Sequence, residues 1–146
     1  MDKTSCGLLI KQIHDATRKH VDNSLRKKGL TLAQGRVLMV LGEEGGSAIA
    51  LKELERRFHV AQSTIAGLVQ RLEAKGFVEG VTASGDNRVK LVRLTPAGEQ
   101  FHKANIKEIV EIEQRLLSPL TGQEQEDFLR MLRTVFDGIK GKTFEA

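Results

Sequence analysis

Apolar positions between residues 51 and 75 recur with the spacing of two helices separated by a short break. In the first repeat Leu51, Leu54 and Phe58 fall at i, i+3 and i+7, which places them on one helical face. The second repeat covers residues 61–75, and its apolar stripe consists of Ile65, Leu68, Val69 and Leu72. Two short amphipathic helices joined by a tight turn predict a helix-turn-helix.

A turn-rich stretch follows the second helix. We predict strands at residues 77–81 and 88–94, joined by a polar turn at 82–87. Residues 48–50 are expected to add a short strand that pairs with this hairpin. A helix-turn-helix followed by a hairpin is a winged helix-turn-helix, a module that inserts its second helix into the major groove of duplex DNA.

Four further helices are predicted outside this segment. Their expected ranges are residues 5–28, 31–41, 96–117 and 121–139. Thr31 and Gln34 match the capping box, in which two side chains satisfy free N–H groups at a helix start, and Thr121 with Glu124 repeats it. The predicted fold class is therefore mainly α with a small β-hairpin wing.

The first helix and the last two carry more apolar surface than a small winged domain can cover. We interpret residues 1–30 and 96–146 as dimerisation helices around a DNA-binding lobe at 31–95, within a single domain of residues 1–146. The residues expected in the dimer interface are Leu9, Ile13, Leu116, Phe128, Leu132 and Phe136. The alternative is that these helices pack only within one monomer. A two-fold dimer requires a palindromic operator with half-sites roughly 34–36 Å apart.

Charge is unevenly distributed along the 146 residues, whose net charge is +4. Residues 51–95 hold eight basic and five acidic side chains, whereas residues 96–146 are slightly acidic. This distribution suits a polyanionic partner, although a merely solubilising surface would give the same net charge. The chain has neither Tyr nor Trp, which argues against a base-stacking surface for single-stranded nucleic acid.

The sequence predicts no targeting signal and no disulfide framework. Its N-terminal residues are polar and lack the apolar core of a signal peptide. The longest purely apolar run, residues 37–41, is far shorter than the roughly 20 residues of a membrane span. A single Cys excludes intrachain disulfides. We therefore expect a cytoplasmic protein that makes no membrane contact.

Several short motifs occur in a characteristic order. They are Gly29-Leu-Thr-Leu-Ala-Gln34 leading into Val37-Leu38, then Leu51-Lys-Glu-Leu54, the helix and turn from Gln62 to Val78, Asp86-Asn-Arg88, and Leu94-Thr-Pro-Ala-Gly98. In this order and spacing the chain resembles the MarR family of bacterial transcription regulators over nearly its whole length. The resemblance implies a homodimer that binds pseudo-palindromic duplex DNA and often releases it on meeting a small ligand or an oxidant.

The outer face of the second helix supplies the candidate DNA contacts. If its apolar stripe points inward, the helical repeat of 100° per residue turns the polar side outward. The candidates on or beside that side are Gln62, Ser63, Thr64, Gly67, Gln70 and Arg71. Gln can bond adenine bidentately, hydroxyls can meet bases or phosphates, and Arg suits phosphate or guanine. Simple solvation is the alternative explanation for a polar outer face.

The hairpin tip carries Asp86, Asn87 and Arg88. The resemblance implies that Asp86 braces Arg88, whose guanidinium reaches into the minor groove, where a narrow A·T-rich segment attracts Arg. A surface ion pair is the alternative. The chain departs from the family at Ala61, Ala66, Gly67 and Asn87, where relatives often carry Ser or Arg. Either its DNA face is less cationic, or Gly67 lets the backbone approach the groove floor closely.

Other chemistries receive less support. Cys6 resembles the switch of the peroxide-sensing branch of the family. That branch also uses Tyr hydroxyls, and this chain has no Tyr, so redox sensing is kept only as an alternative function. A winged-helix module for protein contacts is a second alternative. A small lipophilic or phenolic effector is implied by the resemblance, and His14, Arg18 and Arg36 are loosely suited to line its pocket. The four His match no closed metal site, no cofactor is expected, and no enzyme motif is present.

Overall fold

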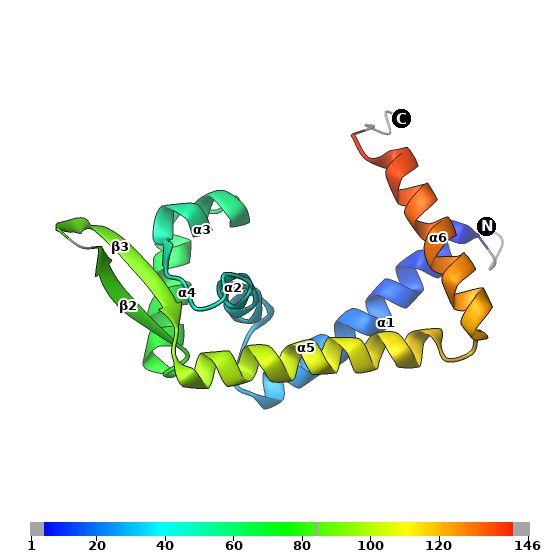
Figure 1. Cartoon of the computed structure of the whole chain (residues 1–146), viewed down its shortest axis with the longest axis horizontal. Helices are drawn as coiled ribbons and strands as arrows, with labels where there is room; N and C mark the ends of the chain where they lie inside the picture. Colours follow the sequence, from blue (N-terminus) through cyan, green and yellow to red (C-terminus); the bar gives the residue numbers. More distant parts are fainter. Residues whose placement is uncertain (1–4, 84, 142–146) are drawn as a thin grey trace. The chain divides into compact units, whose positions relative to one another are not determined.

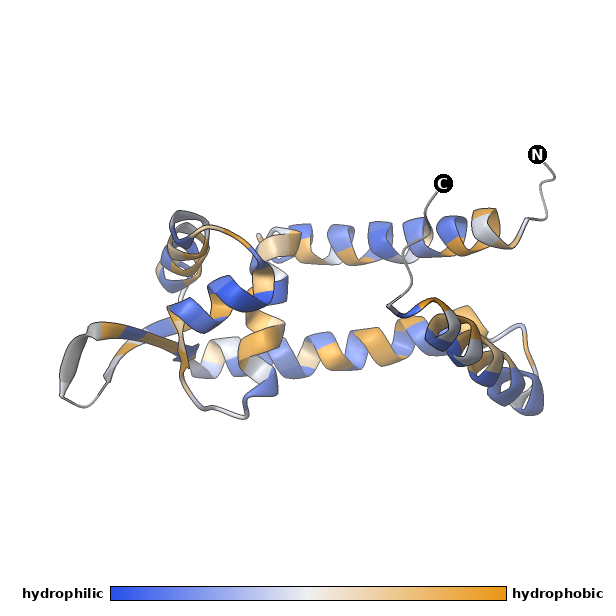
Figure 2. Ribbon diagram, turned by 90° about the horizontal axis from the view of Figure 1, so that it is seen from above, coloured by the Kyte–Doolittle hydropathy of each residue, from blue (hydrophilic) through white to orange (hydrophobic). Residues whose placement is uncertain are grey.

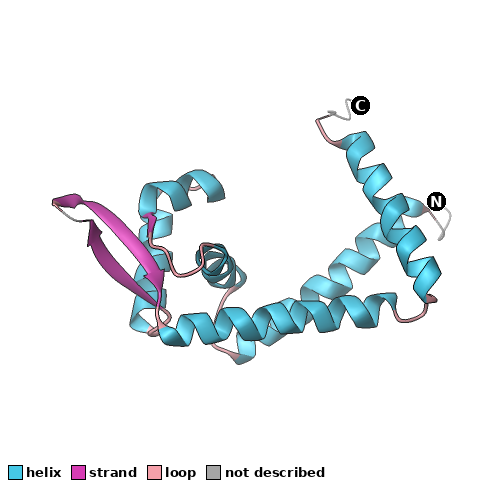
Figure 3. Ribbon diagram, viewed as in Figure 1, coloured by secondary structure: helices cyan, strands magenta, loops and turns pink. Residues whose placement is uncertain are grey.

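The computed structural model describes residues 5–83 and 85–141, with the backbone alone at 83 and 86–88 (Figure 1). Its helices are α1 (Cys6–Lys27), α2 (Leu32–Glu43), α3 (Leu51–Phe58), α4 (Gln62–Ala74), α5 (Pro96–Leu117) and α6 (Gly122–Ile139). Its strands are β1 (Ile49–Ala50), β2 (Val78–Ala83) and β3 (Asp86–Leu94). The described chain is mostly helical with one small sheet, which confirms the predicted fold class (Figure 3).

The chain divides into two compact units, Met1–Ile106 and Lys107–Ala146. The first contains the helix-turn-helix, the sheet, α1, α2 and the beginning of α5. The second contains the end of α5 and all of α6. The single domain over 1–146, with its lobe at 31–95, remains a prediction.

Local chemistry sets the helix ends where the sequence indicated. The Thr31 hydroxyl accepts the Gln34 N–H at 3.2 Å, and the Gln34 side chain accepts the Thr31 N–H at 3.2 Å. Thr121 and Glu124 form the same reciprocal pair at the start of α6. Gly29 follows α1 with φ +73°, a conformation that glycine adopts without strain. Helix α2 continues to Glu43, two residues beyond the predicted end.

The sheet is antiparallel with the order β1-β3-β2. Ile49 pairs with Val92, and Val78 pairs with Leu94, so the apolar side chains of all three strands share one face. The hairpin arms extend further toward the tip than predicted, and an irregularity in register lies between Thr82 and Ala83. Backbone N–H and C=O groups pair whatever the side chain is, so polar residues did not mark the strand ends.

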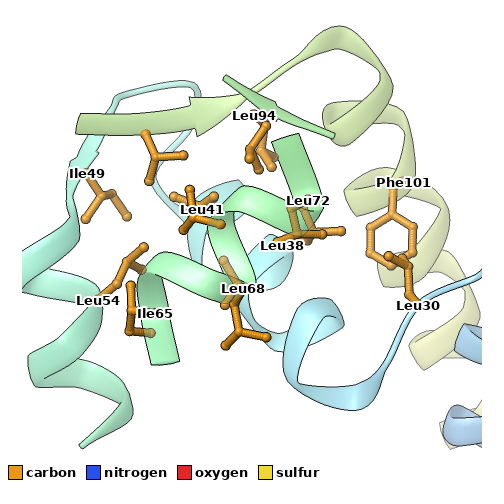
Figure 4. Packing of buried hydrophobic residues seen from close by; sticks show 14 of the residues in the cluster. Leu30, Leu38, Leu41, Ile49, Leu54, Ile65, Leu68, Leu72, Leu94 and Phe101 are labelled. Atoms are coloured by element: carbon orange, nitrogen blue, oxygen red, sulfur yellow. The ribbon is translucent and has the colours of Figure 1, made fainter. Parts of the chain in front are cut away.

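One hydrophobic core lies beneath the sheet and holds the helix-turn-helix together (Figure 4). Its completely buried large side chains include Leu38 and Leu41 from α2, Leu54 from α3, and Ile65 and Leu72 from α4. Burying each such side chain contributes about 1.5–3 kcal/mol. All four apolar residues of the inner face of α4 are buried in this core, so the opposite face of α4 points toward solvent.

The second unit is a helical corner. At the bend after α5 the Gln125 amide donates to the carbonyls of Leu117 and Leu120 at 3.0 and 3.1 Å, and Leu117 is buried. No residue of α6 is buried within the single chain. Among the described residues, no helix combines the length and the apolar character needed to cross a membrane.

Candidate nucleic-acid interface

The outer face of α4 presents polar side chains to solvent. Exposed on it are Gln62, Ser63, Thr64, Gln70 and Arg71, while Gly67 is half-buried. The inner stripe Ile65, Leu68, Val69 and Leu72 is buried, as the helical repeat predicted. The structure therefore brings these candidates together on one accessible helix face, and whether each contacts DNA remains a prediction.

The turn into α4 leaves its leading end without a side-chain cap. His59 adopts a left-handed conformation with φ 52° and closes the turn between α3 and α4. Ala61 occupies the N-cap position, and it has no side-chain oxygen that could accept an N–H. Free N–H groups at a helix start carry partial positive charge and attract anions such as phosphate.

An ion-pair network occupies the arginines of α3. Glu53 accepts from Arg56 at 2.6 and 3.0 Å and from Arg57 at 2.9 Å, and Arg57 also donates to Glu44 at 2.8 Å. The hydrogen bonds from Arg56, and secondly from Arg57, lower the pKa of Glu53 to about 2. The network joins the end of α2 to α3 and partly neutralises two cations of the helix-turn-helix.

A groove of about 610 Å³ runs between α4 and the hairpin. Gln70 and Glu73 line it from α4, and Thr82 and Lys90, which are paired across β2 and β3, line it from the wing. The sequence reasoning missed Thr82 and Lys90. Strand alternation puts positions 88 and 90 on the same face of β3, so the prediction for Arg88 could have been extended to Lys90.

The wing tip is described only in part. The backbone of Asp86, Asn87 and Arg88 lies in β3, with Asp86 paired to Ala83. Their side chains lie outside the described residues, so the brace between Asp86 and Arg88 and its contact with the minor groove stay predictions.

Threonine 95 secures the exit of α4 to the start of α5. Its hydroxyl donates to the Gly76 carbonyl at 2.5 Å and accepts the Gly98 N–H at 3.2 Å. Its own N–H donates to the Phe77 carbonyl at 3.0 Å. The segment after α4 is thus tied directly to α5, the helix that follows the wing.

The residues considered for regulation are dispersed. Cys6 is a free, exposed thiol at the beginning of α1. His14 and Arg18 are exposed on α1, and the Arg36 guanidinium lies 5.2 Å from the centre of the Phe58 ring. Neither the groove beside α4 nor the smaller cavity beside His102 is lined by His14, Arg18 or Arg36. Within the described part of the chain, no group of three His, Cys, Asp or Glu could hold a metal ion.

The terminal helices expose large apolar side chains in the single chain. Of the six residues expected in a dimer interface, Phe136 is 59% exposed, Leu9, Ile13, Leu116 and Leu132 are also exposed, and Phe128 is half-buried. Hydrophobic positions recur along α1, α5 and α6 in Figure 2. Apolar faces of this extent are typical of interaction surfaces.

Comparison with known proteins places this geometry in a family. The model described as "MarR family" matches residues 28–88, which cover α2, the helix-turn-helix and most of the wing. The HTH-type transcriptional repressor IacR of Pseudomonas putida is 30% identical over 129 residues, which are 88% of this chain and 76% of that protein.

Solved structures share the fold. MepR, a transcription regulator of the Staphylococcus aureus multidrug efflux pump MepA, superposes with a TM-score of 0.83 at 21% identity, covering 92% of this chain and 98% of MepR. A point mutant of MepR bound to an oligodeoxyribonucleotide gives a TM-score of 0.75 at 22% identity, with the same coverage. Because the family model and the similarity to IacR agree on the helix-turn-helix, this chain belongs to the MarR family of winged helix-turn-helix proteins, which are DNA-binding transcription regulators and not enzymes.

Proposed function

We propose that this protein is a homodimeric repressor that binds a pseudo-palindromic duplex operator and releases it when a small effector binds. The observation that carries this proposal is the exposed polar face of α4, held outward because its apolar stripe is buried in the core. The similarity to IacR, a repressor by name, supports the repressive sign.

The leading end of α4 is expected to enter the major groove. Gln62 has the bidentate donor and acceptor that adenine requires, and Ser63 and Thr64 offer hydroxyls to bases or phosphates. The uncapped N–H groups after Ala61 favour a phosphate at the same end. Farther along, Gln70 and Arg71 are exposed and suit a base edge and a phosphate or guanine, respectively.

The wing is expected to hold the DNA backbone and the adjacent minor groove. Lys90 and Thr82 line the groove beside α4 and can donate to phosphate oxygens. Arg88, with Asp86 as its brace and Asn87 between them, is expected to reach the minor groove. Because Arg56 and Arg57 are already paired with acidic side chains, Arg88 and Lys90 are expected to provide much of the remaining positive charge.

Homodimerisation is supported by the apolar faces of the terminal helices. Leu9 and Ile13 on α1, Leu116 on α5, and Leu132 and Phe136 on α6 are exposed in the single chain. A second copy would bury them and would present two α4 helices to successive major grooves, about 34–36 Å apart. Leu132→Glu with Phe136→Glu should therefore yield a monomer in sedimentation analysis, whereas a double variant that remains dimeric would contradict this interface.

An effector would act by binding the two states of the dimer with different affinity. The proposed effector is a small lipophilic or phenolic molecule that binds between the dimerisation helices and the DNA-binding lobe. Oxidation of Cys6 is a second way to shift the same equilibrium, supported by the exposure of its thiol. Mild peroxide that changes DNA affinity in the wild type but not in Cys6→Ser would favour the redox route.

Selection of bound sequences from a random duplex pool, with and without candidate effectors, tests the proposed function directly. The wild type should enrich a palindrome, and its affinity should fall with salt at a logarithmic slope of roughly −6 to −9 if about 6–10 phosphates are neutralised. Gln62→Ala with Arg88→Ala should abolish enrichment. Gln100→Ala with Lys103→Ala, which likewise removes one Gln and one cation but from an exposed part of α5, is the control. Specific binding that survives the first double variant would refute the residue assignment.

A further inference from the structure

The C-terminal end of α4 is tied to a corner of the chain far away in sequence. We use the name α1–α2 corner for residues 28–34, which follow α1 and include the first residues of α2. The Lys75 ammonium, at the C-cap of α4, donates to the carbonyl of Gly29 and to Oε1 of Gln34, the latter at 3.1 Å. Lys75 lies 46 residues from Gly29 and 41 from Gln34 along the chain.

Both acceptors are themselves held in place. Gln34 is 3% exposed, and the same Oε1 accepts the Thr31 N–H of the capping box, so one buried oxygen joins the start of α2 to the end of α4. Gly29 lies two residues after the end of α1 and has a positive φ. Lys75 therefore connects α4 to the end of one helix and the start of another at a single point.

Ring contacts join the same place to α5. The Lys28 ammonium lies 5.3 Å from the centre of the Phe101 ring, and Phe101 meets Phe77 edge to face with their centres 5.8 Å apart. Phe77 follows Lys75 by two residues, and Leu30 lies at the same edge of the core as Phe101 (Figure 4). These ring contacts therefore link the residues just after α1 and just after α4 to α5, all within one compact unit.

Apolar packing alone fixes the direction in which α4 faces more firmly than its position along its own axis. Hydrophobic contacts are not directional, whereas hydrogen bonds to two fixed oxygens specify where the helix end lies. The Lys75 hydrogen bonds therefore determine the position of α4 along its axis, which the packing of Leu68 and Leu72 does not.

We propose that Lys75 is a positioning residue that holds the end of the recognition helix to the α1–α2 corner and thereby sets the half-site spacing that the dimer accepts. The inference rests on the proposed function, because α1 and α5 are the helices expected to meet the second subunit. Lys75 need not touch DNA for this role. Its loss should loosen the discrimination between spacings more than it weakens contact with each half-site.

The test uses the full-length protein and the palindrome selected from the random pool. Affinity is measured for that duplex and for duplexes whose half-sites are one base pair closer or farther apart, which displaces a half-site by about 3.4 Å and rotates it by about 34–36°. Lys75→Met keeps the aliphatic stem and removes the donors, whereas Lys75→Arg keeps a cation that can donate to both oxygens. Lys103→Met, at an exposed position of α5, controls for the loss of one positive charge.

We expect Lys75→Met to reduce the wild-type preference for the selected spacing by about three- to thirtyfold. Lys75→Arg and Lys103→Met should keep that preference. An unchanged preference in Lys75→Met, a lost preference in Lys75→Arg, or a Met variant that does not fold by circular dichroism would each overturn the inference. A wild type that enriches no palindrome would overturn the proposed function itself, and with it this inference.

Discussion

Gly98→Ala tests whether the exit of the recognition helix is as tightly packed against α5 as the structure indicates. A Cβ at Gly98 would lie 2.1 Å from the Phe77 carbonyl oxygen and 3.0 Å from a methyl of Leu94. Close C···O contacts are about 3.3–3.6 Å, so backbone must move by more than an ångström. That same carbonyl accepts the Thr95 N–H, so the shift also strains a hydrogen bond.

The magnitude follows from three effects. Overpacking of this kind costs about 1–3 kcal/mol. Weakening the bond from Thr95 to Phe77 adds about 0.5–1.5 kcal/mol, and the better helix propensity of Ala returns about 0.5–1 kcal/mol. We therefore expect the free energy of unfolding to fall by about 2–3 kcal/mol, which lowers Tm by about 5–10 °C for a chain of this size.

Urea unfolding followed by circular dichroism measures the effect, and a fixed protein concentration is used because the stability of the proposed homodimer would depend on concentration. The matched control is Gly67→Ala, another helical glycine, where an added Cβ meets only the end of the Arg71 side chain at 3.8 Å. The control should be as stable as the wild type or up to about 1 kcal/mol more stable. A Gly98→Ala variant within 0.5 kcal/mol of the wild type, a margin well below the roughly 1 kcal/mol expected from the smallest overpacking effect, would refute the packing argument.

Three further predictions concern other contacts. Gly67→Ala should weaken binding to the selected palindrome while leaving Tm unchanged or raised, because its methyl lies on the outer face of α4; undiminished affinity would argue against close approach of the backbone. Gly42→Ala would place its Cβ 2.1 Å from the His102 ring, so it should lower the free energy of unfolding. Adding His102→Ala should restore most of that stability in a double-mutant cycle, whereas additive losses of stability would show that the ring is not the obstacle. The pKa of Glu53 is about 2 in the folded protein against an ordinary 4.5, so its stabilising effect is complete above pH 5 and disappears as pH falls from about 5 to 2. Unfolding should therefore depend more steeply on pH in that window for the wild type than for Glu53→Gln, and equal slopes would mean that the bonds to Arg56 and Arg57 do not persist in solution.

Much of the local architecture was readable from residues a few positions apart. The reciprocal bonds of Thr31 with Gln34 depend only on a capping pattern that spans four residues. The inward stripe of α4 follows from the helical repeat, because burying Ile65 and Leu72 determines which face remains outside. The missing cap at Ala61 was likewise visible in the residue itself, since alanine carries no acceptor.

The site needed more than the pattern. Lys90 reads as one cation in a strand, and only the pairing of β3 with β2 beside α4 puts it in the same groove as Gln70. The pairing of Arg57 with Glu53 follows from the helical repeat, whereas only the packed structure shows that Glu44, 13 residues earlier, binds Arg57 as well. Such contacts depend on how separate elements pack, and no local spacing encodes the distance between their side chains.

The sequence by itself determined the order of the helices and strands, their caps, and the face of α4 that points outward, because each depends on interactions within a turn or two of the backbone. The tertiary structure alone decided that Lys75 meets Gly29, that Gly98 lies against Phe77, and that Arg57 also binds Glu44. These contacts join residues 13 to 46 positions apart. The longer ones exist only because burial of a common core brings α1, α2, α4 and α5 to one place, and that convergence is a property of the packed chain rather than of any segment.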